Sequence, residues 1–117
     1  MSLDVTTDVR EGIVLVTLTG ELDIYTVNGF RRVLDELDVA GGTLAVDLTG
    51  VTLLDSSGLG ALVSLLNRAR EANGRLGLIC PHRRLRRLFE ITGLRRSFIF
   101  ADDLPALRGL LAAPPEE

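Results

Sequence analysis

The chain contains no lysine and no tryptophan, and it has one cysteine and one histidine in 117 residues. A single cysteine excludes an internal disulfide, and Cys80 with His82 supplies too few ligands for a typical metal site. Without lysine, the P-loop that binds nucleotide phosphates cannot be built, because it needs that side chain. We therefore expect no metal ion and no cofactor.

Long apolar runs and a strong charge of one sign are also lacking. No segment approaches the length that spans a bilayer, and Met1 is followed by an acidic segment rather than a basic and then apolar one. We expect no signal peptide, no membrane span and a cytoplasmic location. The net charge of −3 gives no reason to expect nucleic acid as a partner.

The composition is typical of a folded domain. The chain is 46% hydrophobic and 25% charged, and its length supports one hydrophobic core but not two. We expect one domain over residues 1–112, followed by a disordered tail at 113–117 that contains two prolines and two glutamates.

Hydrophobic periodicity predicts an alternation of strands and helices. Strands are expected near residues 3–9, 13–19, 43–48, 75–80 and 97–100, and Gly20 is expected to end the second of them. Helices are expected to begin after Thr26, near Ser56, at Pro81 and at Asp102. The strand–helix–strand order implies parallel pairing, and a hairpin at 10–12 adds an antiparallel strand. The fold class is therefore α/β, a sandwich with helices packed on a mixed sheet of four or five strands.

The most informative stretch is Leu54-Asp55-Ser56-Ser57-Gly58-Leu59-Gly60, where a strand ends and a helix begins. Asp55 or Ser56 is the natural N-cap, and the free amides and dipole of a helix start also favour a phosphate. The two glycines cost the helix about 1 kcal/mol each relative to alanine. Either a partner surface approaches the bare backbone, or the glycines only let the helix pack on the sheet.

Four collinear segments resemble the STAS-domain anti-sigma factor antagonists of bacteria. Residues 55–60 look like the signature of that family, and the other matches are residues 18–23, 46–51 and 85–94. The likeness covers roughly residues 3 to 111. It implies a single-domain STAS-like fold and a regulatory protein that is not an enzyme.

The resemblance also implies a mechanism. The unphosphorylated antagonist binds an anti-sigma factor, which is a serine kinase, and the sigma factor is released for transcription. Phosphorylation then switches the antagonist off, and a serine phosphatase resets it. Ser56 matches the family's phosphorylation site. The residues that the resemblance implies for partner contact are Glu21, Asp23, Asp55, Ser57, Gly58, Leu59 and Gly60.

Other functions receive less support from the residues. A hydrolase triad built on Ser56 or Ser57 lacks the glycine pattern of a nucleophile elbow. A STAS-like adaptor subunit of a transport or lipid-trafficking complex, with Ser56 only as a cap, stays open, and so does a small-molecule or nucleotide sensor. The arginines within residues 83–87 and 95–96 favour a solvated helix face. A role for them in binding an acidic partner stays open.

Overall fold

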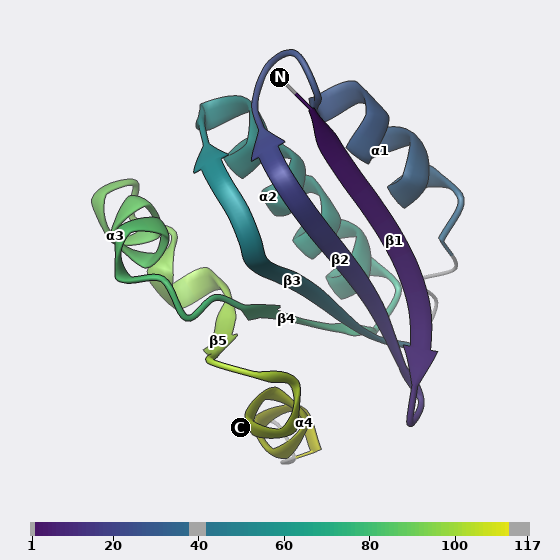
Figure 1. The fold of residues 1–117 in the computed structure, drawn as a ribbon. Helices are drawn as coiled ribbons and strands as arrows, with labels where there is room; N and C mark the ends of the chain where they lie inside the picture. The colour runs from purple at the N-terminus through teal and green to yellow at the C-terminus, as the bar shows by residue number, and fades with distance from the viewer. Residues whose placement is uncertain (1, 38–41, 113–117) are drawn as a thin grey trace.

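The computed structural model describes residues 2–37 and 42–112, which form one five-stranded sheet in the order β1-β2-β3-β4-β5 (Figure 1). β1 (Leu3–Arg10) is antiparallel to β2 (Ile13–Leu22). Parallel pairing then joins β2 to β3 (Thr43–Leu54), β4 (Arg75–Ile79) and β5 (Ile99–Ala101). The predicted mixed sheet of an α/β protein is confirmed. The predicted tail at 113–117 lies outside the described residues.

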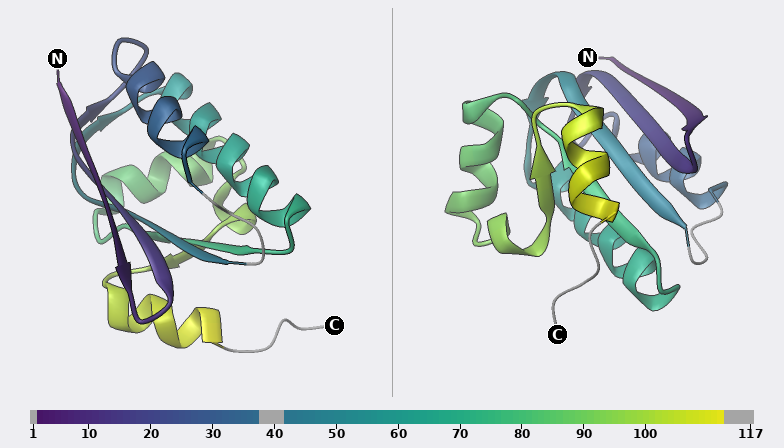
Figure 2. Two further views of the ribbon diagram at one scale, coloured as in Figure 1. Left: turned by 90° about the vertical axis from the view of Figure 1, so that its right-hand side faces the viewer. Right: turned by 90° about the horizontal axis from the view of Figure 1, so that it is seen from below.

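Four α-helices cover the two faces of this sheet. α1 (Val27–Asp35), α2 (Ser56–Glu71) and α3 (Arg83–Ile91) contribute to the larger core, and α4 (Leu104–Ala112) packs alone on the opposite face (Figure 2). A short 3-10 helix, η1 (Arg95–Ser97), joins α3 to β5. The sheet is therefore the middle layer, as the sandwich prediction required.

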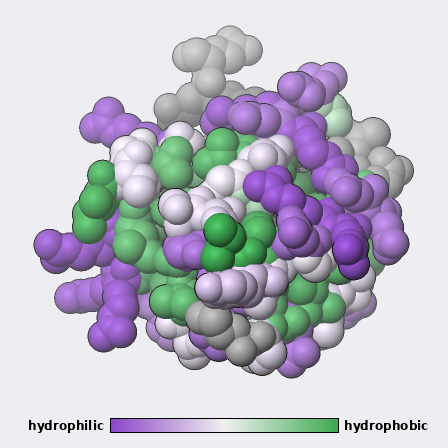
Figure 3. Space-filling view, turned by 90° about the horizontal axis from the view of Figure 1, so that it is seen from above, coloured by the Kyte–Doolittle hydropathy of each residue, from purple (hydrophilic) through white to green (hydrophobic). Residues whose placement is uncertain are grey.

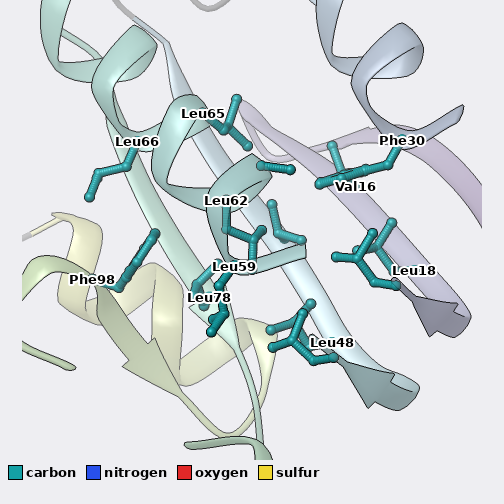
Figure 4. Packing of buried hydrophobic residues seen from close by; sticks show 14 of the residues in the cluster. Val16, Leu18, Phe30, Leu48, Leu59, Leu62, Leu65, Leu66, Leu78 and Phe98 are labelled. Carbon is teal, nitrogen blue, oxygen red and sulfur yellow. The ribbon is translucent and has the colours of Figure 1, made fainter. Parts of the chain in front are cut away.

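Strand residues alternate between the two cores because successive side chains of a strand point to opposite faces. In β2, Val16 and Leu18 contribute to the large core, whereas Ile13 and Leu15 contribute to the smaller one under α4. Figure 4 shows the leucines of α2 packed on the sheet, with Phe30 of α1 beside Val16 of β2. Burial on both faces explains why β2, β3 and β4 are rich in apolar residues, whereas the mostly exposed β1 is not.

The first two strands meet in a two-residue turn. Glu11 and Gly12 have φ values of 53° and 83°, and two positive values in succession are the mark of a type I′ turn, which suits the twist of a hairpin. The predicted hairpin is therefore confirmed at its expected position.

The ends of two strands were predicted too early. β2 does not stop at Gly20 but continues to Leu22, and β3 continues past residue 48 to Leu54. Gly20 has a φ of 114°, and a Cβ there would collide with the carbonyl oxygen of Ser2. Irregular register near Gly20 and Gly50 lets the two strands run on together, so both end beside the motif at 55–60.

Cys80 follows β4 and is fully buried in the larger core, where it packs as a structural thiol. Burial raises the pKa of this thiol, so it stays protonated near neutral pH. No helix among residues 2–37 and 42–112 is long and apolar enough to cross a bilayer.

Candidate functional site

Two segments that follow neighbouring strands meet at one edge of the sheet. Leu22 and Leu54 are paired at the ends of β2 and β3, and the Asp55 amide donates to the Leu22 carbonyl at 3.3 Å. The Ile24 amide donates to Asp55 Oδ2 at 3.0 Å. These contacts hold the two segments together. We call residues 21–26 and 53–60 the strand-end surface.

Asp55 is the N-cap of α2. Its backbone is extended, and its Oδ1 accepts from the Gly58 amide at 3.1 Å while Oδ2 accepts from Ile24. One carboxylate thus satisfies a free amide of the helix start and fastens the segment after β2 to it. Of the two caps that the sequence left open, Asp55 has this role, and Ser56 does not.

Ser56 is the first residue of α2 and is exposed. Its hydroxyl makes no hydrogen bond to any other described residue, because the neighbouring Asp55 does the capping. Ser57 is half-buried, and its hydroxyl likewise has no hydrogen-bond partner within residues 2–37 and 42–112. Of the two serines, Ser56 is the more open to an enzyme that would modify it.

The two glycines of the motif have different surroundings. A Cβ on Gly58 would lie 2.7 Å from Leu54 Cδ1 and 2.9 Å from the Leu22 carbonyl oxygen, so this glycine lets α2 pack closely on the sheet. Gly60 is exposed, and the nearest atom to a Cβ there is a guanidinium nitrogen of Arg31 at 4.0 Å. Packing therefore explains why residue 58 is a glycine. No contact within the described residues explains why residue 60 is one.

Three residues that the resemblance assigned to partner contact are buried. Gly58 packs against the sheet, Leu59 is only 7% exposed and belongs to the large core, and Asp23 is 2% exposed. Burial leaves these three residues little area for direct contact, and their role at a partner interface stays a prediction. They shape the strand-end surface from below.

Asp23 holds the loop between β2 and α1. Its Oδ1 accepts from the amides of Tyr25 at 2.9 Å and Thr26 at 3.1 Å, and the Thr26 hydroxyl lies within 3.3 Å of it. Oδ2 is buried and has no hydrogen-bond partner among the described residues. A carboxylate that turns back to bind the amides two and three residues on forces a tight turn, and this turn directs the next side chains outward.

The large side chains that reach the surface here are mainly apolar, and they were not predicted from the sequence. Tyr25 is 78% exposed, Ile24 is 63% exposed and Leu53 is 41% exposed. Seen from the edge where β2 and β3 end, hydrophobic residues lie at the surface among polar ones (Figure 3). Two large apolar residues in a predicted loop were the available signal, since such positions are usually polar.

The charges at this edge are mainly negative. Glu21 is half-buried in β2, and Asp23 and Asp55 follow within the same surface. His82 has its Nε2 2.6 Å from the Thr49 carbonyl oxygen and so contacts β3 rather than either serine. Within the described residues, no group of three histidine, cysteine or carboxylate side chains could hold a metal ion. The site can present a hydroxyl but has no general base paired with it.

The sequence profile of the STAS domain family matches residues 4–106. The chain is 35% identical over 95 residues to the anti-sigma-B factor antagonist of Bacillus subtilis (strain 168), which covers 81% of this chain and 87% of that protein. The crystal structure of an anti-sigma factor antagonist from Mycobacterium paratuberculosis has a similar fold, with a TM-score of 0.81, 22% identity and 96% of each chain covered. The phosphorylated form of the Bacillus cell fate determinant SpoIIAA also has this fold, with a TM-score of 0.69, 24% identity, and 92% of this chain and 99% of that one covered.

Proposed function

The chain belongs to the STAS domain family, among the anti-sigma factor antagonists, and we propose that it is a phosphorylation-controlled switch. As a regulator rather than an enzyme, the unphosphorylated protein binds an anti-sigma factor that is a serine kinase, which frees the sigma factor. The kinase then phosphorylates Ser56, and the phosphorylated antagonist dissociates from it. A serine phosphatase restores the binding form. We place this cycle in the cytoplasm, where sigma factors act.

The observation that carries this proposal is the free hydroxyl of Ser56 at the start of α2. It is exposed and has no hydrogen-bond partner in the described part of the chain, so a kinase can reach it without breaking a native contact. A phosphate at this place would meet the positive end of the helix dipole. The fold therefore tolerates the modification. SpoIIAA, which shares the fold, has a phosphorylated form.

The effect of the phosphate would be on the partner rather than on the fold. It adds about −1.5 to −2 charges and three strong acceptors to an edge that already carries Asp55 and Glu21. A partner surface that covers a neutral serine beside Tyr25 and Ile24 would have to bury these charges without compensation. A loss of about 3 kcal/mol lowers affinity more than a hundredfold, which is enough for a switch.

We propose that the contact surface for the kinase consists of exposed residues on both segments. Tyr25, Ile24 and Leu53 supply apolar area, Ser56 lies among the exposed positions, and Gly60 admits close approach of the partner backbone. Tyrosine is enriched among residues that dominate protein interfaces because it buries a large area at low entropic cost. Asp23, Gly58 and Leu59 support this surface without touching the partner, and half-buried Asp55, Ser57 and Glu21 lie at its margin.

The direct test is phosphorylation by the cognate kinase. The purified protein is incubated with candidate anti-sigma kinases and ATP, and the site is mapped by mass spectrometry. We expect phosphate on Ser56, none on the Ser56→Ala variant, and unchanged modification of Ser57→Ala. Modification that persists in Ser56→Ala would falsify the assignment.

Calorimetric titration against the same kinase with ADP tests the switch itself. We expect high affinity for the wild-type protein and for Ser56→Ala, reduced affinity for Ser56→Asp, and the lowest affinity for the phosphorylated protein. Aspartate supplies one charge where phosphate supplies nearly two, so its effect should be partial. Equal affinities for the phosphorylated and unphosphorylated forms would remove the switch and leave an adaptor role as the better account.

A further inference from the structure

The charges of the chain are separated between α3 with its following turn and the rest of the molecule. Six of the 13 arginines lie within residues 83–96, where Glu90 is the one acidic residue, so this segment carries +5. The remaining residues contain seven arginines and fifteen carboxylates and carry −8. A short basic segment on an acidic protein is the arrangement that attracts an acidic partner to one place.

Most of these arginines are not used inside the fold. Arg86 and Arg95 are the exceptions. Arg86 pairs with Asp102 at 3.0 Å, donates to the Cys80 carbonyl at 2.6 Å and lies over the Phe100 ring, and Arg95 pairs with Glu90 at 3.4 Å. Arg83 and Arg87 are exposed and form no ion pair with any other described residue. The fold therefore has no visible need for their charges.

The exposed side of α3 combines charge with apolar area. Arg83, Arg87 and Ile91 are each four residues apart and so lie on one stripe of the helix, opposite the buried Leu85 and Phe89. Ile91 is 71% exposed. Beside the stripe is a hollow of about 340 Å³ whose lining residues are Arg83, Arg86, Arg87, Glu90 and Arg95. We call Arg83, Arg87, Ile91 and Arg95 the arginine face.

The chemistry of the arginine face favours a folded acidic protein over a nucleic acid or a membrane. The nine residues of α3 are about 13 Å long, so a long polyanion would extend beyond them along a protein whose other residues carry a net formal charge of −8. Arginine together with an exposed aliphatic side chain is typical of protein interfaces. The concave lining is suited to the carboxylates of a compact partner.

We propose that the arginine face docks an acidic surface of the serine phosphatase that resets Ser56. This inference rests on the proposed function. Once Ser56 is phosphorylated, the strand-end surface repels the kinase, and an enzyme that must bind this form needs a contact that the phosphate does not weaken. A positive surface away from Ser56 supplies such a contact.

The position of α3 suits this role. His82, at the start of α3, contacts the Thr49 carbonyl of β3, and a hollow of about 580 Å³ lies between these two elements. From Thr49 the strand runs for five more residues, about 17 Å, to Leu54 at the edge that carries Ser56. An enzyme held on α3 can thus reach the phosphoserine across one side of the molecule.

The experiment compares two double variants that remove the same charge. Arg83→Ala/Arg87→Ala changes the arginine face, and Arg10→Ala/Arg32→Ala removes two exposed arginines elsewhere. Each protein is phosphorylated on Ser56, and its dephosphorylation by the purified cognate phosphatase is followed at several salt concentrations between about 50 and 300 mM. Ile91→Ser serves as a second variant that alters the face without a change of charge.

We expect Arg83→Ala/Arg87→Ala to raise KM about tenfold with kcat unchanged, and to remove most of the salt dependence of KM. Ile91→Ser should raise KM at every salt concentration. The control pair should behave as wild type, and the kinase affinity of all variants should be unchanged.

An unchanged KM in both arginine-face variants overturns the proposal, and so does an equal loss of kinase affinity, which would assign α3 to the kinase surface. Binding of duplex DNA or of anionic vesicles that is lost in Arg83→Ala/Arg87→Ala would also overturn it. A kinase that fails to modify Ser56 refutes the proposed function itself, whereas normal phosphorylation with unchanged dephosphorylation refutes only this inference.

Discussion

The strand-end surface has a buried side and an exposed side that alternate along the chain. Asp23 is 2% exposed, and Tyr25, two residues later, is 78% exposed. Gly58 packs against Leu22 and Leu54, and Gly60, two residues later, is open to solvent. Neighbouring residues of the strand-end surface thus have different roles. The buried members fix the shape of the edge, and the exposed members are available to a partner.

Gly58→Ala should have the largest effect and should act on stability. The new Cβ would lie 2.7 Å from Leu54 Cδ1, 2.8 Å from Leu22 Cγ and 2.9 Å from the Leu22 carbonyl oxygen, and a backbone atom cannot move aside as a side chain can. We expect the free energy of unfolding to fall by about 3 kcal/mol in urea titration. A stability equal to wild type would mean that α2 does not pack this closely on the sheet.

Asp23→Ala should destabilise the protein by about 2 kcal/mol, because it removes the side-chain acceptor of the Tyr25 amide and one of the two acceptors of the Thr26 amide. The Thr26 hydroxyl keeps its 2.7 Å hydrogen bond to the Glu21 carbonyl oxygen. The loss of stability reverses the expectation for an exposed loop charge, which would contribute almost nothing. The matched control is Asp23→Asn, whose amide oxygen can still accept and whose NH₂ replaces the unpartnered Oδ2. In thermal denaturation, the midpoint of Asp23→Asn should be well above that of Asp23→Ala. Equal midpoints for all three proteins would contradict the assigned role.

Tyr25→Ala should weaken kinase binding by about 2 kcal/mol, roughly thirtyfold, as expected for an exposed aromatic anchor. The unfolding free energy should change by less than about 0.5 kcal/mol, since the side chain packs little in the free protein. Calorimetric titration provides the affinity, and Tyr25→Phe separates the ring from the hydroxyl. An affinity like wild type for Tyr25→Ala would exclude Tyr25 from the interface.

Gly60→Ala should have a modest effect on stability, opposite in sign to that of Gly58→Ala. Alanine is favoured over glycine in a helix by about 1 kcal/mol, and the nearest atom to the new Cβ is 4.0 Å away. We expect a gain of up to that amount in urea titration. If the kinase backbone approaches Gly60, the affinity of the Gly60→Ala variant for the kinase should fall at the same time. A variant that is stabilised and binds normally would show that Gly60 lies outside the contact.

The sequence predicted the order of elements and the place of the motif well. The strands and helices carry strong periodicity, and α2 ends where Asn73, a residue that favours helix ends, has a positive φ of 59°. The ends of β2 and β3 were less well predicted. Their last residues include Gly20 and Gly50, which locally favour a turn, and only pairing between the two strands keeps them extended.

The candidate site divides in the same way. The acidic and hydroxyl residues at the strand end could be found from the sequence, because Asp-Ser-Ser before a helical pattern is a local signal. The sequence could not show which of these residues would be exposed. Asp23 is buried because the amides of its own turn and the start of α1 surround it, and Gly58 is buried because α2 packs on the ends of β2 and β3.

Local properties of the chain, namely periodicity, caps and turn residues, are enough to specify an α/β domain with a serine motif at the start of a helix. The exposure of each side chain depends instead on contacts between residues far apart in sequence, such as the bond from Ile24 to Asp55 across 31 positions. The tertiary structure alone decided that Ser56 is free, that Asp23 is internal and that Ile24 and Tyr25 reach the surface. Those outcomes require the two strands to end side by side, which no single segment encodes.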